Sequence, residues 1–202
     1  TGLDQNDYII EFGMIPFDTE TKTLEENLAR SFTVHCPSFE TLKPQLAPWV
    51  IDHNEGLIKK AHKEGVDHVT FRKKMEEYLQ RPDVKDYFQH TPISQIVLFG
   101  KSVNSIDIPF LNRDLGWGFM KEHFSHRVLD LTSTALTLID LNFLPDECAS
   151  GSDLMKYLGM GEVEHTALAD ARNTAIMYLK LVEMFFNNSR FKIITSFKSF
   201  FL

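Results

Sequence analysis

An imidazole and a carboxylate, His165 and Asp170, stand five residues apart at the start of an expected helix. The imidazole can take or give a proton near neutral pH, and the carboxylate can hold a metal ion. A second carboxylate, Asp107, follows an apolar segment, residues 95–99, that predicts a central strand. It therefore falls at the carboxyl end of that strand, where ligands bind in open α/β sheets. Each residue also has an ordinary interpretation as a helix cap or a solvated charge.

The elements that must position these residues are read from the hydrophobic pattern. Apolar residues recur at helical spacing over residues 166–186, without Gly or Pro, which predicts one long helix carrying Asp170 in its second turn. The continuous apolar run at 95–99 predicts a strand buried on both faces, followed by a polar loop at 101–106 and a helix that opens at Asp107. Further strands are expected at residues 8–17, 28–35 and 127–130, a polar linker at 81–91, and helices at 39–49, 54–64, 70–80, 131–141 and 152–158.

Composition limits the class of protein. The chain has 202 residues, of which 43% are hydrophobic, enough for one α/β domain with a sizeable core. Only two cysteines are present, Cys36 and Cys148, so we expect no disulfide framework and a reducing compartment, the cytoplasm. No apolar run reaches membrane-spanning length, so we expect no membrane association.

Charge limits the class of partner. With a net charge of −7, the protein is poorly suited to bind long duplex DNA by electrostatics alone. This charge does not exclude a short oligonucleotide held by metal ions and a local basic patch. The main concentration of basic residues, which is either a solvated face or a phosphate-binding surface, consists of Lys59, Lys60, Lys63, Arg72, Lys73 and Lys74. Glu11, within an expected strand, is interpreted as a hydrogen-bonded or sheet-edge carboxylate.

Several ordered segments resemble the oligoribonuclease branch of the DEDDh exonucleases, in the ribonuclease H-like superfamily. Thr1-Gly-Leu-Asp4 followed by Tyr8-Ile-Ile-Glu11 resembles the first motif, in which T-G-L-D leads into I-I-E. Gly100-Lys-Ser-Val, followed by Asp107-Ile-Pro-Phe-Leu111, resembles the second, in which G-N-S precedes D-x-x-F-L. His165-Thr-Ala-Leu-Ala-Asp170 matches the third, H-x-x-x-x-D. Trp49 with Gly56-Leu57 resembles the W...S-G-L segment. The resemblance covers residues 1–186.

The resemblance implies a fold and a chemistry. The fold would be α/β, a ribonuclease H-like mixed sheet flanked by helices, with an exonuclease domain at residues 1–187 and a tail at 188–202. The chemistry would be phosphodiester hydrolysis with two divalent ions, Mg²⁺ or Mn²⁺. Asp107 and Asp170 would bind the metal ions, with His165 as general base. Substrate-binding positions would be Gly2, Leu3, Trp49, Ser102 and His126.

The chain also departs from the family pattern. In the family, a D-x-E motif on a leading strand directly precedes T-G-L, whereas this sequence begins at the Thr, so we expect that motif and strand upstream in the full protein. The loop from Gly100 to Asp107 is one residue longer than expected, which weakens the match of Ser102. His126 stands where the family has a Tyr that reaches the phosphate across a homodimer interface, and it also suits a surface loop.

We therefore expect a 3′-to-5′ exonuclease that releases nucleoside 5′-monophosphates from short single-stranded RNA or DNA, with a homodimer implied by the resemblance alone. The alternatives are a proofreading or DNA-trimming exonuclease of the same superfamily and a catalytically silent oligonucleotide-binding module. A scaffold unrelated to nucleic acids is a more distant alternative. Asp-x-Glu immediately before Thr1 would favour an enzyme, and apolar or small residues there would favour the binding module.

Overall fold

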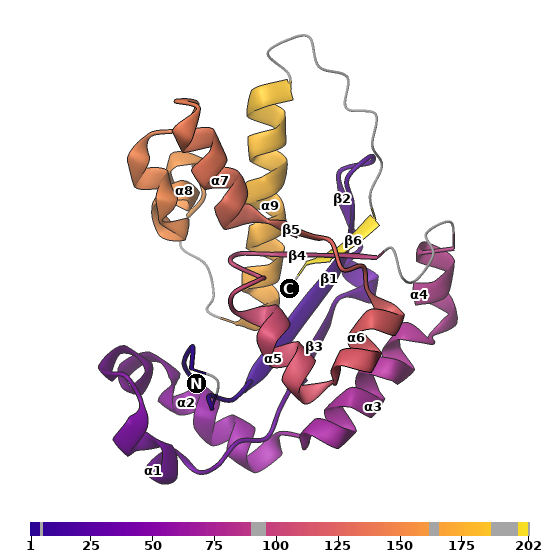
Figure 1. Ribbon diagram of the computed structural model, residues 1–202, viewed down its shortest axis with the longest axis vertical. Helices are drawn as coiled ribbons and strands as arrows, with labels where there is room; N and C mark the ends of the chain where they lie inside the picture. Colours follow the sequence, from indigo (N-terminus) through magenta and orange to yellow (C-terminus); the bar gives the residue numbers. More distant parts are fainter. Residues whose placement is uncertain (5, 90–95, 162–165, 187–197, 202) are drawn as a thin grey trace.

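The structure is a computed structural model, and it describes residues 1–4, 6–89, 96–161, 166–186 and 198–201. It is a mixed α/β fold, with helices on both sides of a small sheet (Figure 1). The described strands are β1 (Glu11–Asp18), β2 (Thr23–Leu24), β3 (Arg30–Thr33), β4 (Val97–Gly100), β5 (Val128–Asp130) and β6 (Lys198–Phe201). They are connected in the order β2-β1-β6-β4-β5, and β3 also pairs with β1.

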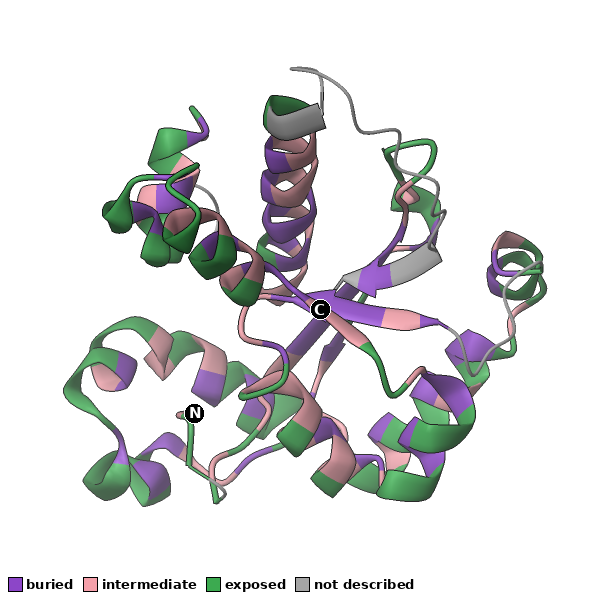
Figure 2. Ribbon diagram, turned by 45° about the horizontal axis from the view of Figure 1, so that its top comes forward, coloured by how far each residue is buried: buried purple, intermediate pink, exposed green. Residues whose placement is uncertain are grey.

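Strand β1 organises the sheet. It runs antiparallel to β2, β3 and β6, while β4 runs parallel to both β6 and β5. Alternate side chains of a strand point to opposite faces, so Phe12 and Met14 enter one apolar cluster while Ile15 and Phe17 enter another. Because both faces of β1 are covered, six of its eight residues are buried (Figure 2).

The helices form the two outer layers. On one face of the sheet, α3 and α5 contribute Phe71 and Leu111 to the Phe12 cluster, and on the other face α9 contributes Ala171 to the Phe17 cluster. The helices are α1 (Phe39–Leu42), α2 (Pro48–Glu64), α3 (His68–Leu79), α4 (Pro82–Tyr87), α5 (Asp107–Asp114), α6 (Trp117–His123), α7 (Leu131–Asp140), α8 (Gly151–Tyr157) and α9 (Ala167–Phe186). Short 3₁₀ turns are η1 (Glu26–Leu28), η2 (Lys43–Gln45) and η4 (Asp146–Ala149).

Most expected elements are confirmed, and the differences have local causes. The linker predicted at residues 81–91 is wrong, because α4 begins there at Pro82. The helix predicted from residue 54 begins earlier, at Pro48. Proline suits the first turn of a helix, where its missing N–H would have no partner in the helix. The strand predicted at residues 8–17 is β1, which begins at Glu11 rather than Tyr8. The strand predicted at residues 28–35 is β3, which covers only Arg30–Thr33.

The C-terminal segment takes part in the sheet. Strand β6 lies between β1 and β4, and Phe200 is fully buried against Phe88, with ring centroids 4.8 Å apart. Part of the segment expected as a tail, residues 188–202, thus forms a strand of the sheet. The central position that β6 fills, antiparallel to β1 and parallel to β4, is next to the strand that carries Glu11.

Two other expectations concern the chain as a whole. Cys36 and Cys148 are both free and buried, as the prediction of no disulfide framework requires. None of the helices in the described residues is long and apolar enough to cross a membrane.

Candidate functional site

Asp107 is the first residue of α5 and lies just beyond the carboxyl end of β4. It is not the cap of that helix: Ile106 occupies the cap position and makes no side-chain cap hydrogen bond. Burial raises the pKa of the Asp107 carboxyl to about 6, and the neighbouring Asp130 carboxylate contributes to the rise. A hydrogen bond from its own backbone N–H and the charge of Lys101 act in the opposite direction. Such a displaced pKa is typical of functional sites.

Lys101 connects Asp107 with Asp170. It follows β4 directly, and its Nζ lies 3.9 Å from the Oδ1 atom of Asp170. The same ammonium acts on the Asp107 carboxyl. The fold thus pairs Lys101 with Asp170 and leaves its charge near enough to lower the pKa of Asp107. The sequence pattern predicted only a polar loop at Lys101. The position of Lys101 directly after a buried strand could have indicated that it lies at the site.

The first turn of α9 is fixed on β1. It carries Asp170, which was expected one turn later. Glu11 Oε2 accepts a hydrogen bond from the backbone N–H of Ala167 at 2.9 Å, which confirms the interpretation of Glu11 as a hydrogen-bonded carboxylate. A side chain at Gly13 would lie 2.4 Å from the backbone nitrogen of Leu168, so only glycine permits this close approach. His165, the expected general base, lies outside the described residues.

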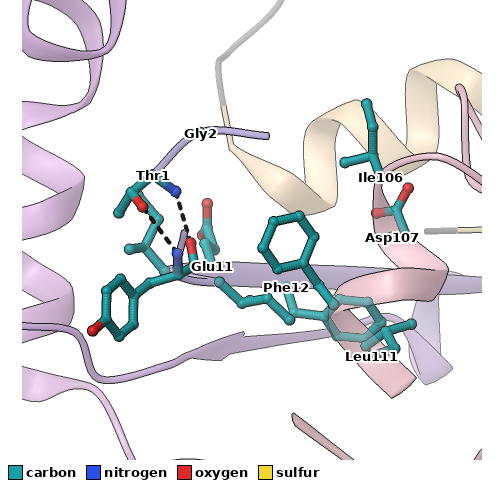
Figure 3. Close-up of a pocket in the computed structure, with 11 residues that line it drawn as sticks. Thr1, Gly2, Glu11, Phe12, Ile106, Asp107 and Leu111 are labelled. Carbon is teal, nitrogen blue, oxygen red and sulfur yellow. Dashed lines mark hydrogen bonds between the residues drawn. The ribbon is translucent and has the colours of Figure 1, made fainter. Parts of the chain in front are cut away.

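A cavity of about 170 Å³ lies between the N-terminal residues, the start of β1 and α5. Figure 3 shows Asp107 and Glu11 among its lining residues, with Thr1 and Gly2 at one side. Thr1 is held there by hydrogen bonds from its nitrogen to the Tyr8 carbonyl (2.7 Å) and from the Tyr8 N–H to its hydroxyl (2.9 Å). Gly2, an expected substrate-binding position, thus lines the same cavity as Asp107.

The aromatic candidate is exposed. Trp49 lies in the first turn of α2 with 62% of its surface accessible, and its ring stacks on His53 at 4.4 Å with only 9° between the planes. The His53 ring is held by a 2.8 Å hydrogen bond between Nδ1 and the Trp49 carbonyl. In both overall views α1 and α2 curve around the N-terminal residues (Figures 1 and 2). Leu3, in that N-terminal segment, is 74% exposed.

Ser102 and His126 have different relations to Asp107. Ser102 lies in the loop between β4 and Asp107, at a positive φ of 55°, and its hydroxyl donates a hydrogen bond to the Thr132 hydroxyl at 3.0 Å. His126 is exposed and precedes β5, whereas Asp107 follows the carboxyl end of the parallel neighbour β4. Parallel strands place these two positions at opposite ends of the sheet. Within one chain, the structure therefore does not bring His126 to Asp107.

The predicted basic concentration lies on the surface of two helices. All six of its side chains are exposed, on α2 and α3. Lys59 pairs with Glu55, and Lys73 pairs with Glu77 at 3.8 Å, both one helical turn away. Such pairs compete with any phosphate that approaches the surface.

The carboxylates near Lys101 differ from a complete metal site. Among the described residues, no three His, Cys, Asp or Glu side chains form a group that could hold a metal. The Asp107 and Asp170 pair nevertheless fits Mg²⁺ in chemical type, because Mg²⁺ is usually bound by one or two carboxylates together with water and substrate phosphates. The Lys101 ammonium already occupies the place of a cation beside Asp170.

Comparison with known proteins gives no independent assignment. No protein-family model matches the chain, and no curated protein matches it significantly.

Proposed function

We propose that this protein is a metal-dependent 3′-to-5′ exonuclease that hydrolyses short single-stranded oligonucleotides to nucleoside 5′-monophosphates. One observation carries the proposal: Lys101 Nζ lies 3.9 Å from Asp170 on α9, and the charge of the same lysine lowers the pKa of Asp107 on α5. An oxygen-only pair of carboxylates suits hard divalent ions, which are the cofactors of phosphodiester hydrolysis.

Each candidate residue has a role in this proposal. Asp107 and Asp170 hold divalent ions, and His165 takes the proton from the attacking water. The ions, when bound, stabilise the negative charge on the scissile phosphate and activate the water. Asp107 must be ionised to bind a metal, and with a pKa of about 6 it is largely ionised at neutral pH.

The architecture supports the finer assignment of a ribonuclease H-like fold. A long strand, β1, is antiparallel to its neighbours β2, β3 and β6, and β6 is followed in the sheet by the parallel strands β4 and β5. Helices cover both faces, and Asp107 and Asp130 lie at the carboxyl ends of β4 and β5. The mixed sheet and its antiparallel start are the features that support this assignment.

The surroundings of Asp107 favour a short substrate. The adjoining cavity, of about 170 Å³, is of a size to hold part of one nucleotide. The exposed Trp49 ring offers a surface on which a base can stack, a contact worth about 1–3 kcal/mol per base. Gly2 and Leu3 lie at the N-terminal side, where an apolar side chain could contact a terminal base.

A catalytically silent oligonucleotide-binding module is the second candidate. The observation in its favour is the ion pair between Lys101 and Asp170, because a carboxylate that already has a cation partner has less need of a metal ion. Binding without hydrolysis would follow.

The deciding experiment is hydrolysis of labelled dinucleotides and longer single strands with Mn²⁺, on protein that includes any residues naturally upstream of Thr1. We expect mononucleotides to be released from the 3′ end. His165→Ala should lower turnover by about two to four orders of magnitude if it is the base, and His68→Ala, an exposed histidine at the start of α3, should have no effect. Oligonucleotide binding without product would support the silent module instead.

A further inference from the structure

Lys101 lies between the end of β4 and the start of α8. It directly follows the buried end of β4, and its Cδ lies 3.6 Å from the position that a side chain on Gly151, the first residue of α8, would take. About a third of the side chain is exposed, and its Nζ lies 3.9 Å from Asp170 Oδ1. The stem thus lies close to Gly151, and the ammonium lies close to Asp170.

The loop that carries Lys101 is also anchored. The backbone N–H of Val103 donates to Asp130 Oδ2 at 2.6 Å, and the Ser102 carbonyl accepts from the N–H groups of Ser105 and Ile106 at 2.9 and 3.0 Å. A tight loop of this kind limits where the Lys101 backbone can move. The direction of the ammonium therefore depends mainly on the partners of its side chain.

Resting on the proposed function, we propose that Lys101 is a built-in counter-cation that competes with a divalent ion for Asp170 and, once displaced, contacts a phosphate of the oligonucleotide. Two cations repel each other, so a metal ion at Asp170 displaces the ammonium. The released ammonium stays beside the site, because its stem lies close to Gly151. A flexible ammonium with three donors is suited to a phosphate oxygen.

Titration of Mn²⁺ into the full chain, followed by calorimetry, tests the first half of this proposal. Lys101→Met should tighten Mn²⁺ binding about two- to fivefold, which is the effect of losing one partly exposed ion pair. Lys101→Arg keeps the charge and should bind Mn²⁺ like the wild type. The matched control is Lys156→Met, which removes a lysine paired with Asp153 at 3.0 Å on α8 and should change nothing.

The second half is tested by the affinity for a phosphorothioate pentanucleotide. With Mn²⁺ present, Lys101→Met should weaken binding about three- to tenfold, as expected for one partly exposed charge-assisted contact. With EDTA present, the same substitution should have little effect, because Lys101 then remains paired with Asp170. Lys101→Arg should restore most of the affinity in Mn²⁺.

The outcomes separate this inference from the proposed function. If Lys101→Met behaves like Lys156→Met in the Mn²⁺ titration, or binds the pentanucleotide like the wild type, the inference is overturned, while loss of Mn²⁺ binding in Asp107→Asn would still support the nuclease. If neither the wild type nor any variant takes up Mn²⁺, both the metal site and the inference are refuted.

Discussion

The carboxyl ends of two neighbouring parallel strands, β4 and β5, each lead to an aspartate and a helix, yet the two aspartates differ. Asp130 is the cap of α7: its Oδ1 accepts from Ser133 at 2.7 Å and its Oδ2 accepts from Val103 at 2.6 Å. Asp107 lies inside the first turn of α5, where burial raises its pKa to about 6. The same pattern of strand, aspartate and helix thus gives one satisfied carboxylate and one that is costly to ionise.

This difference indicates which aspartate is structural. A buried carboxylate with two backbone donors stabilises its own loop and has its hydrogen-bonding capacity committed. A partly buried carboxylate whose backbone donor is only its own N–H is unfavourable when ionised, and carboxylates with such raised pKa values cluster at functional sites. Asp130 also holds the loop that leads to Asp107, through Val103, so the structural aspartate positions the candidate functional one.

The largest expected effect concerns hydrolysis. If Asp107 binds a metal ion, Asp107→Asn should lower turnover of a labelled dinucleotide by about two to four orders of magnitude, because the amide is a poor ligand for a hard cation. Asp130→Asn, assayed at a temperature at which it stays folded, should retain turnover within about tenfold of the wild type. Equal losses in the two variants would remove the distinction between these aspartates.

The next effect concerns stability, and here Asp130 is the more sensitive position. Asp130→Ala removes the acceptors of two backbone N–H groups, one of them on the fully buried Val103, and should cost about 2–4 kcal/mol of unfolding free energy. Urea unfolding followed by circular dichroism measures this loss. Asp107→Ala is the matched control, and it should not cost stability at neutral pH, because the one backbone N–H that stabilises the Asp107 carboxylate is its own and burial makes that charge unfavourable.

The sequence was sufficient to predict the local pattern at these positions. The apolar run before Gly100 and the helix starting at Asp107 follow from residue periodicity, and both are confirmed. The interpretation of Glu11 as a hydrogen-bonded carboxylate also follows from local context, because a charge in the middle of an apolar strand needs a partner.

Long-range pairing could not be predicted in the same way. That Lys101 reaches Asp170, on a helix far along the chain, depends on the packing of α9 against β1 and on the short loop after β4. The insertion of β6 beside β1 likewise depends on which strand edge is open, and no local pattern encodes that. The linker predicted at residues 81–91 is wrong for a local reason, since the segment is polar but Pro82 favours the start of a helix.

A smaller effect tests the charge of Asp107 through pH. Its folded-state pKa is raised from the ordinary 3.8 to about 6, so between these values the folded protein keeps a proton that the unfolded chain releases, and stability falls as pH rises. The penalty is fully developed above about pH 6 and amounts to about 3 kcal/mol at most. Asp107→Asn should therefore stabilise the protein by about 1–3 kcal/mol at pH 8 and not at pH 4, as measured by urea unfolding at each pH. A gain of equal size at both pH values would contradict this account.

The smallest expected effect comes from a metal ion bound only to the folded state. At a Mg²⁺ concentration about ten times the dissociation constant, the stabilisation is about 1.4 kcal/mol, which raises the melting temperature of a chain of this size by a few degrees. Asp107→Asn should abolish this shift, whereas Asp130→Asn should retain it, because the Asp130 oxygens are already engaged by Val103 and Ser133. Thermal unfolding with Mg²⁺ and with EDTA measures both. A shift that survives in Asp107→Asn but is lost in Asp130→Asn would reverse the assignment, since the metal would then compete with the cap of α7 rather than with Lys101.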